Sequence, residues 1–409
     1  MFSKQLRITL ANFATDRVDV SNEVTPVTIM GAYAHLGLGL VRSLGRMGIP
    51  VYVLDRNLDA PAFYSRYCTE RFRHAKTLVD LLDIGCKIGQ KSVLIPTDDQ
   101  SCLFVAENSH RLRARFIFPE VETDLVRSLV SKKELYNKAK LHGVPTAEIS
   151  FPQSKDELDD FMGRHNFPIV AKAIHGWQWD VRGGKTAIIK SPRELIALYN
   201  LAYPNLILQE YIPGGNEADW IFNGYFNAQS ECLFGYSGKK IRQWPPQGGI
   251  TTLGVCSRNK STDQSAKEFL ASIGYRGIVD MDFRYDARDG KYKLLDVNPR
   301  VGSTFRLFVS DTGIDVARSL YNDLTGKLVR IGDVPDGRKW MAENFDLLAI
   351  LSCMRRRELT LARLRDSFVG LQETAYFAAD DPIPYLFACN RSFVSAAISS
   401  LFFGKRKVE

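Results

Sequence analysis

From Val27 onward, the pattern of apolar and polar positions predicts alternating strands and helices. The apolar run Val27 to Met30 is followed by a glycine-rich stretch, by leucines at helical spacing and by a second apolar run, Val51 to Leu54. This order predicts a βαβ unit with Asp55 at the end of its second strand. Such units often bind dinucleotides, but the glycines here do not fit the G-x-G-x-x-G pattern. The sequence therefore favours a βαβ unit that binds no NAD.

A further helix and strand follow this unit. Residues 77–89 have helical periodicity, and residues 92–99 form an apolar strand that ends in Thr97, Asp98 and Asp99. Polar side chains at the carboxyl end of a parallel strand lie where open α/β sheets bind ligands. The same side chains also suit the N-cap of the next helix, and the pattern favours capping.

The next segment predicts a helix over residues 131–143 and a strand over residues 167–173. The strand buries alternate apolar side chains and carries Lys172 on its other face. A loop with Gly183 and Gly184 leads from it into another strand. Such a loop can fold over a triphosphate, because glycines leave the backbone N–H groups unobstructed. A plain hairpin turn is the alternative.

Residues 206–226 predict a strand that ends in Glu210, a Pro-Gly-Gly bend with Glu217 beyond it, and a second strand. The region that follows, which we expect to select the substrates, carries Lys240 and Arg242. These two cations are either grips for a substrate carboxylate or phosphate, or solvated surface side chains.

Residues 277–300 predict an antiparallel hairpin that carries acidic side chains at alternate positions. Pairing across its polar turn brings Asp282 opposite Asp296, and two facing carboxylates cost stability unless a cation lies between them. Asn298 lies two residues beyond Asp296 and so points to the same side. With Arg300 nearby, these oxygens suit Mg²⁺ and the phosphate oxygens that it bridges. A strand that runs into an Asn-Pro turn is the alternative, which the pairing with Asp282 makes less attractive.

The C-terminal residues 331–409 predict a mostly helical extension. Its last apolar run, near residues 392–403, is too short to span a bilayer. The run could form a peripheral membrane contact beside the basic tail, although a helix packed on the body of the protein is the favoured interpretation. The start of the chain has no signal-peptide pattern, and we expect no transmembrane segment.

Composition and charge limit the function classes. With 45% apolar and 24% charged residues, the 409-residue chain is neither disordered nor fibrous. The net charge of +8 permits attraction to phosphate-bearing ligands, but the basic residues are spread along the chain, so we expect no nucleic acid partner. The seven cysteines form no C-x-x-C pair, which indicates a reducing, cytoplasmic location without disulfides or a thiolate zinc site.

Taken in order, these pieces resemble the ATP-grasp superfamily of carboxylate–amine and carboxylate–thiol ligases. The resemblance runs from about residue 27 to residue 325, and it is closest to the carboxylate–amine ligase branch that includes D-aspartate ligase. The resemblance implies an α/β ATP-grasp fold, in which two α+β subdomains clamp ATP behind a Rossmann-like pre-ATP-grasp domain. The implied divisions are an N-terminal arm (1–26), the pre-ATP-grasp domain (27–130), a small lid subdomain (131–205), a larger metal-bearing subdomain (206–330) and the C-terminal extension (331–409).

The resemblance also implies how the nucleotide is held. Lys132 and Lys172 would neutralise the ATP phosphates as point charges. Glu210 would face the adenine, the backbone at residues 211–212 (Tyr211 and Ile212) would pair with the base edge, and Glu217 would accept from the ribose hydroxyls. Gly183 and Gly184 would cover the phosphates, although their loop is longer than the common pattern.

The metal and the reacting groups follow in the same way. Asp282, Asp296 and Asn298 would hold one or two Mg²⁺ ions, with Mn²⁺ as a substitute, and Arg300 would hold the phosphoryl group or a substrate oxyanion. The family usually has glutamate where Asp296 stands, which puts bridging of two metals in doubt.

The implied reaction is ligation of a small-molecule carboxylate to an amine through an acyl phosphate, with ADP and phosphate as products. In this scheme Lys172 and Arg300 are the catalytic residues. The alternatives are a carboxylase-like enzyme that uses bicarbonate and a non-catalytic nucleotide-binding partner or sensor. The identity of the acid and the amine, and a homodimeric state, are left open.

Overall fold

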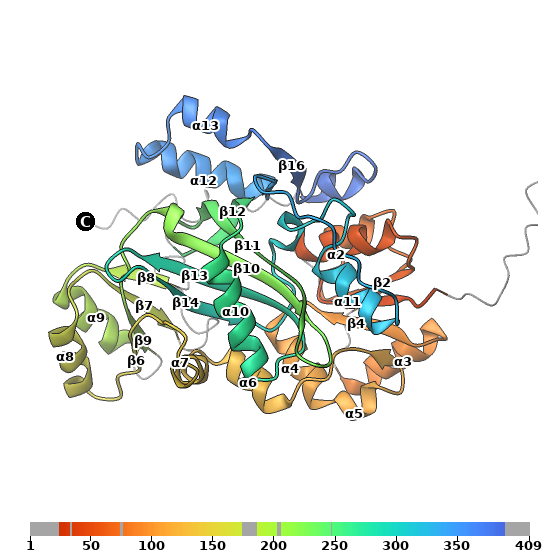
Figure 1. The fold of residues 1–409 in the computed structure, drawn as a ribbon, viewed down its shortest axis with the longest axis horizontal. Helices are drawn as coiled ribbons and strands as arrows, with labels where there is room; N and C mark the ends of the chain where they lie inside the picture. Colours follow the sequence, from red (N-terminus) through yellow and green to blue (C-terminus); the bar gives the residue numbers. More distant parts are fainter. Residues whose placement is uncertain are drawn as a thin grey trace, which may run out of the picture.

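In the computed structural model, the protein contains three sheets (Figure 1). Their strands come from three successive parts of the chain. The structure describes residues 24–32, 35–73, 77–173, 186–202, 206–246 and 248–388. This arrangement confirms the α/β class. Gly183 and Gly184, and the apolar run near residues 392–403, lie outside the described residues.

The first sheet is parallel and has five strands in the order β3-β2-β1-β4-β5. The strands and their main helices are β1 (Val27–Met30), α2 (His35–Gly45), β2 (Val51–Asp55), β3 (Glu70–Arg73), α3 (Leu78–Ile88), β4 (Ser92–Pro96), α4 (Asp99–Glu107), α5 (Ser109–Leu112) and β5 (Phe116–Ile117). The predicted βαβ unit and the αβ repeat after it are therefore confirmed. Asp55 accepts a hydrogen bond from the backbone N–H of Ala32 at 2.5 Å, so its carboxylate closes the turn after β1.

The second sheet is antiparallel, has four strands in the order β6-β9-β7-β8 and lies beside two helices, α8 and α9 (Figure 1). The elements of this part are α6 (Thr123–Val130), α7 (Lys132–Leu141), β6 (Ile149–Ser150), α8 (Lys155–Arg164), β7 (Ile169–Ala173), β8 (Thr186–Ile189), α9 (Pro192–Ala202) and β9 (Leu206–Glu210). Ser131 caps α7 by accepting from the backbone N–H of Glu134, and Gly143 follows the helix with φ +70°. Both ends of the predicted helix are therefore confirmed within two residues.

The third sheet has seven strands in the order β14-β13-β10-β11-β12-β15-β16, and all its pairs except β15 with β16 are antiparallel. Its elements are η2 (Asn216–Ala218), β10 (Asp219–Phe226), β11 (Cys232–Trp244), β12 (Ile250–Cys256), α10 (Lys260–Ser272), β13 (Gly277–Asp286), β14 (Lys291–Asn298), η3 (Phe305–Leu307), α11 (Val316–Leu324), β15 (Lys339–Met341), α12 (Glu343–Arg355), α13 (Leu361–Ser367) and β16 (Leu371–Thr374). Alternate side chains on the face of the sheet that packs against α10, such as Phe222, Met281 and Val297, form one buried apolar cluster with this helix.

The C-terminal extension is part of this third sheet. Besides α12 and α13, it supplies β15 and β16, two strands that its sequence pattern did not predict. Among the described residues, no helix is long and apolar enough to cross a membrane.

Two buried ion pairs tie the extension to the rest of the chain. Asp381 accepts from Arg42 Nε at 2.9 Å and from Ser65 Oγ at 2.7 Å, which joins the extension to the first domain. Arg242 on β11 makes two hydrogen bonds, of 2.9 and 2.6 Å, to the carboxylate of Asp346 on α12. Arg242 is therefore neither a solvated surface cation nor available to bind a substrate anion, because its guanidinium group is paired with the buried carboxylate of Asp346.

A buried histidine at the same junction makes the stability of the fold depend on pH. His35 packs with its ring centroid 5.3 Å from that of Trp340 and 5.8 Å from that of Tyr376, and burial lowers its pKa to about 4. The unfolded state therefore binds one more proton than the folded state between pH 6.5 and 4. We expect His35 to lower the free energy of unfolding by about 2 kcal/mol between pH 7 and pH 5. Urea denaturation of the wild type and of His35→Phe at both pH values measures this, and an equal pH dependence in the two proteins would contradict it.

Candidate functional site

The hairpin of β13 and β14 has the register that the sequence predicted. Asp282 lies directly opposite Asp296, and Asp280 lies opposite Asn298. One of the two strands carries a bulge just after this pair, between Asp282 and Phe283. Carboxylate and amide oxygens from two strands therefore share one face of the sheet.

Two lysines balance the facing carboxylates. Lys132, the first residue of α7, pairs with Asp296, and Lys240 on β11 pairs with Asp282 at 2.7 Å. Burial opposes the charged form of Asp296, but Lys132 lowers its pKa overall. Burial likewise opposes the charge of Lys240, whose pKa is nevertheless raised by Asp282 and Asp219. Lys240, with 12% of its side chain exposed, is a site residue that the sequence had left between two interpretations.

Asp280 is a further site residue that the sequence reasoning did not select. It accepts hydrogen bonds from Asn223 Nδ2 at 2.9 Å and from Asn298 Nδ2 at 3.3 Å. Burial, together with the charge of Asp282, raises its pKa to about 7. Its position two residues before Asp282, in phase with it along the strand, was the signal that could have found it.

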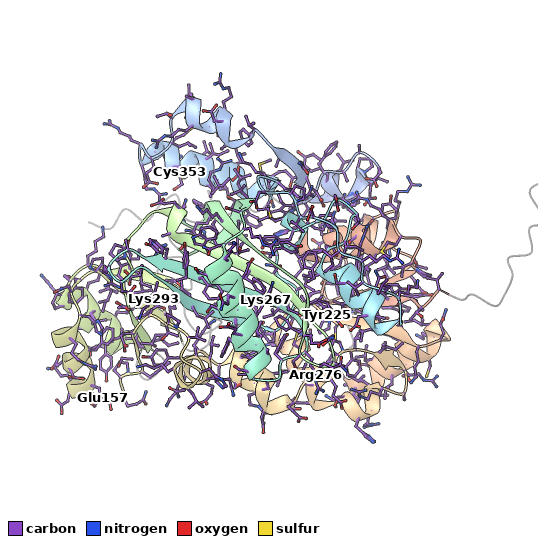
Figure 2. The ribbon with its side chains drawn as sticks, in the orientation of Figure 1. Glu157, Tyr225, Lys267, Arg276, Lys293 and Cys353 are labelled. Carbon is purple, nitrogen blue, oxygen red and sulfur yellow. The ribbon has the colours of Figure 1, made fainter. Side chains whose placement is uncertain are left out.

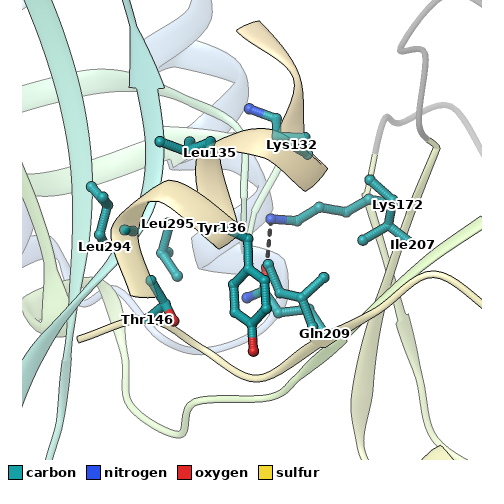
Figure 3. Close-up of a pocket in the computed structure, with 11 residues that line it drawn as sticks. Lys132, Leu135, Tyr136, Thr146, Lys172, Ile207, Gln209, Leu294 and Leu295 are labelled. Carbon is teal, nitrogen blue, oxygen red and sulfur yellow. Dashed lines mark hydrogen bonds between the residues drawn. The ribbon is translucent and has the colours of Figure 1, made fainter. Parts of the chain in front are cut away.

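Lys172 lies in a pocket between α7, β9 and β14 (Figure 3). Its Nζ donates to Gln209 Oε1 at 2.8 Å, and burial together with the charge of Lys132 lowers its pKa to about 8. The other lining side chains are mainly apolar, and they are Leu135, Tyr136, Ala139, Thr146, Ile149, Ile207, Leu294 and Leu295. The pocket thus joins an apolar chamber to two lysines, Lys132 and Lys172.

Glu210 faces the other end of the hairpin. Its carboxylate contacts Arg288 at 2.6 Å and Lys293 on β14 at 3.2 Å, and it accepts from the backbone N–H of Glu148 at 3.0 Å. Burial raises the pKa of Glu210, but these donors lower it overall. Glu210 thus links the second sheet to the turn of the β13–β14 hairpin, and its carboxylate does not contact the Asp282–Asp296 pair.

The linker after Glu210 is held from the third sheet. Arg284 donates to the carbonyl oxygens of Ile212 at 2.9 Å and of Gly214 at 2.6 Å. Glu217 accepts from the backbone N–H of Gly215 at 2.8 Å, inside its own turn. Residues 212–214 therefore lie beside Arg284 of β13, a strand inside the third sheet.

Arg300 joins the hairpin to the first domain. Its Nε contacts Asp99 at 3.0 Å, and its Nη2 donates to Asn298 Oδ1 at 3.1 Å. Asp98, which precedes Asp99 in the sequence, caps α4 by accepting from the backbone N–H of Ser101 at 2.8 Å. This confirms the capping prediction. The sequence indicates a helix-capping role for Asp99 together with Asp98. It cannot assign Asp99 a separate role, because the contact with Arg300 depends on how the first and third sheets pack.

The donor set fits Mg²⁺. Among the described side chains, no three or more His, Cys, Asp or Glu residues are grouped as a closed metal site. Asp282, Asp296 and Asn298 instead supply a few hard oxygens on one face. This is the arrangement that Mg²⁺ uses when waters and substrate phosphates complete its octahedron.

Comparisons with known proteins add to this picture. No family model matches the sequence. The chain is 25% identical over 248 residues to a D-aspartate ligase of Enterococcus faecium, a match that covers 57% of this chain and 59% of that protein. It is 23% identical over 258 residues to a carbamoyl-phosphate synthase of Methanobrevibacter smithii, covering 58% and 64%. The chain thus spans about three fifths of the length of these curated relatives.

A solved structure also shares the arrangement of sheets. It is N5-carboxyaminoimidazole synthetase from Staphylococcus aureus, complexed with ADP. The two chains superpose with a TM-score of 0.62 at 15% identity, over 82% of this chain and 87% of the other. At this identity the likeness concerns the fold.

Proposed function

We propose that this chain is a member of the ATP-grasp superfamily and an ADP-forming ligase that joins a carboxylate to an amine, as its similarity to D-aspartate ligase and its fold support. The observation that carries the proposal is the Asp282–Asp296 pair with Lys132, Lys240 and Arg300 around it. Several partly buried cations beside paired carboxylates suit a polyphosphate and the metal that accompanies it.

We propose that ATP binds with its base in the apolar chamber and its phosphates toward Lys132 and Lys172. The pocket lining is mainly apolar and includes both lysines, which supports this orientation. The roles of Glu210, Glu217 and the backbone of residues 211–212 in base and ribose binding stay predictions, as does the covering of the phosphates by Gly183 and Gly184. The first sheet lies within residues 27–130, which supports the first proposed division. Because β9 (Leu206–Glu210) belongs to the second sheet, we place the boundary between the next two divisions after residue 210 and not after residue 205.

Asp282, Asp296 and Asn298 would hold Mg²⁺, or Mn²⁺ in its place. The ion would neutralise phosphate charge and so favour attack on the γ-phosphorus. Lys132 and Lys240 pair with the two carboxylates in this structure, and we expect both to turn to phosphate oxygens when nucleotide binds.

The proposed chemistry has two steps. A carboxylate oxygen of the first substrate bonds to the γ-phosphorus while the bond to ADP breaks, which gives an acyl phosphate; Lys172 stabilises the phosphate charge. The amine nitrogen then bonds to the acyl carbon, phosphate leaves and the amine loses a proton, while Arg300 stabilises the oxyanion. We place the reaction in the cytoplasm, because the cysteine pattern indicates a reducing compartment.

A screen of amino acids and amines, read by phosphate release and followed by mass spectrometry of the product, tests the proposal. We expect release only with Mg-ATP, one acid and one amine together. The absence of turnover with every pair would favour the nucleotide sensor instead.

A carboxylase-like reaction is the second candidate. It is favoured by the match to a carbamoyl-phosphate synthase, which is a relative at 23% identity. Bicarbonate as the acid in the same screen separates the two, because phosphate release with bicarbonate alone would point to carboxylation.

Asp99 provides a prediction about the first domain. Replacing Asp99 with Asn removes the charge that holds Arg300 Nε, so we expect kcat to fall roughly tenfold while the KM for Mg-ATP stays unchanged. Steady-state kinetics measures this, with Glu107→Gln on the same helix as the control. An unchanged kcat would mean that Asp99 does not position Arg300.

A further inference from the structure

Helix α12 packs with its polar and small side chains inward and its leucines outward. Its buried residues are Asp346, Ala349 and Cys353, the last of which is labelled in Figure 2. Four of the five exposed residues on the helix are apolar, and they are Leu347, Leu348, Leu351 and Met354, which are 38–59% exposed. Soluble helices normally show the reverse pattern.

This orientation is specified by a buried polar network. Asp346 accepts both hydrogen bonds from Arg242 and a third from Thr252 Oγ1 at 2.7 Å. Rotating the helix to bury its leucines would break this pair and leave two buried charges without partners. The apolar face therefore stays outward as a consequence of the fold.

Arginines follow the apolar face along the chain. Five exposed arginines lie in and after the helix, and they are Arg355, Arg356, Arg357, Arg363 and Arg365. Two exposed acids pair with two of them, Glu358 with Arg356 at 2.8 Å and Asp366 with Arg365 at 3.3 Å. The other three have no acidic partner among the described side chains.

We propose that α12 and the arginines after it dock on an anionic lipid surface. The exposed leucines and Met354 would enter the boundary between headgroups and acyl chains, and the guanidinium groups would meet lipid phosphates. The helix lies near one end of the molecule, beyond β12 and with α13 further out (Figure 1).

Charge favours lipid over a second copy of this chain. In an antiparallel pair of α12 helices, the arginines would face the partner's helix N-terminus, which is itself positive. The acids there are already committed, because Glu343 accepts from the backbone N–H groups of residues 376 and 377, and Asp346 is held by Arg242. A lipid surface supplies only negative charge, whereas the same face of a second copy would bring five exposed arginines against two exposed acids.

Co-sedimentation of the full chain with vesicles tests the proposal. We expect binding to vesicles of phosphatidylglycerol and phosphatidylcholine, weak binding to pure phosphatidylcholine, and loss of binding as salt is raised. The double variant Leu351→Ser, Met354→Ser and the double variant Arg355→Gln, Arg357→Gln should each bind roughly tenfold more weakly. Leu58→Ser, which changes an exposed leucine of the first domain, is the matched control and should bind like the wild type.

Three outcomes would overturn the proposal. The first is equal binding by the wild type and the α12 variants. The second is a wild-type dimer that the α12 variants convert to monomer without vesicles, which would assign the face to a second copy. The third is binding that appears only after residues 389–409 are deleted, which would assign the face to the end of this chain. The substituted residues of α12, the two arginines and Leu58 lie outside the proposed ATP site. ATP turnover in each variant therefore reports whether the protein is folded, independently of lipid binding.

Discussion

Replacing Asp296 with Asn is expected to reduce Mg-dependent ATP turnover by roughly a hundredfold or more. The change removes one of two facing carboxylates that would hold the metal, and it leaves Lys132 without its ion-pair partner. ADP release at saturating Mg-ATP, with a substrate pair from the screen, measures the effect. Asp289→Asn, in the turn of the same hairpin, is the matched control and should keep its activity.

The result has to be separated from loss of folding. Thermal denaturation of Asp296→Asn should show a folded protein, because the broken Lys132–Asp296 pair is partly exposed and the substitution also relieves the repulsion from Asp282. A folded Asp296→Asn variant that turns over Mg-ATP at the wild-type rate would contradict the assignment of this carboxylate as a metal ligand.

Replacing Arg242 with Met should lower the free energy of unfolding by about 3–5 kcal/mol. The side chain is 3% exposed and its partner Asp346 is 1% exposed, so the substitution leaves a carboxylate buried without its cation. The double replacement Arg242→Met, Asp346→Leu should recover much of the loss, because it removes both charges together. Urea denaturation measures all of these variants.

A surface pair offers the comparison. Arg164 and Asp160 form an i, i+4 pair with side chains 61% and 64% exposed, and Arg164→Met should cost less than about 1 kcal/mol. An Arg242→Met protein no less stable than Arg164→Met would mean that α12 is not held by its ion pair. That outcome would also remove the physical reason for its outward leucines.

The core of the candidate site could be read from the sequence because it is local. Alternation of apolar and acidic residues on two strands, with a short polar turn between them, determines which side chains face each other. Asp282 and Asp296 are opposite in the structure for that reason. The same reasoning applied one step further along the strand would have added Asp280.

Contacts between distant segments could not be read in this way. Lys240 reaches Asp282 because β10 lies between β11 and β13, and this strand order depends on tertiary packing. The contact of Asp99 with Arg300 joins α4 to the segment after β14, and no periodicity encodes it. Glu210 ends its strand as expected, but its partners Arg288 and Lys293 depend on how the second sheet meets the hairpin.

The strands of the C-terminal extension were missed for a related reason. β15 and β16 are three and four residues long, too short to show a period, and they become strands because the edge of the third sheet is open to them. Helices α12 and α13 were predicted as part of a helical extension, but the pairing of Arg242 with Asp346 was not.

Trapping of the acyl phosphate tests the central claim most directly. Hydroxylamine in place of the amine should convert the activated acid into a hydroxamate. We expect one hydroxamate, one ADP and one phosphate per turnover with Mg-ATP and the right carboxylate, and formation of all three roughly a hundredfold slower with Asp296→Asn. Formation of AMP and pyrophosphate, or hydroxamate formation that does not require ATP, would contradict the account.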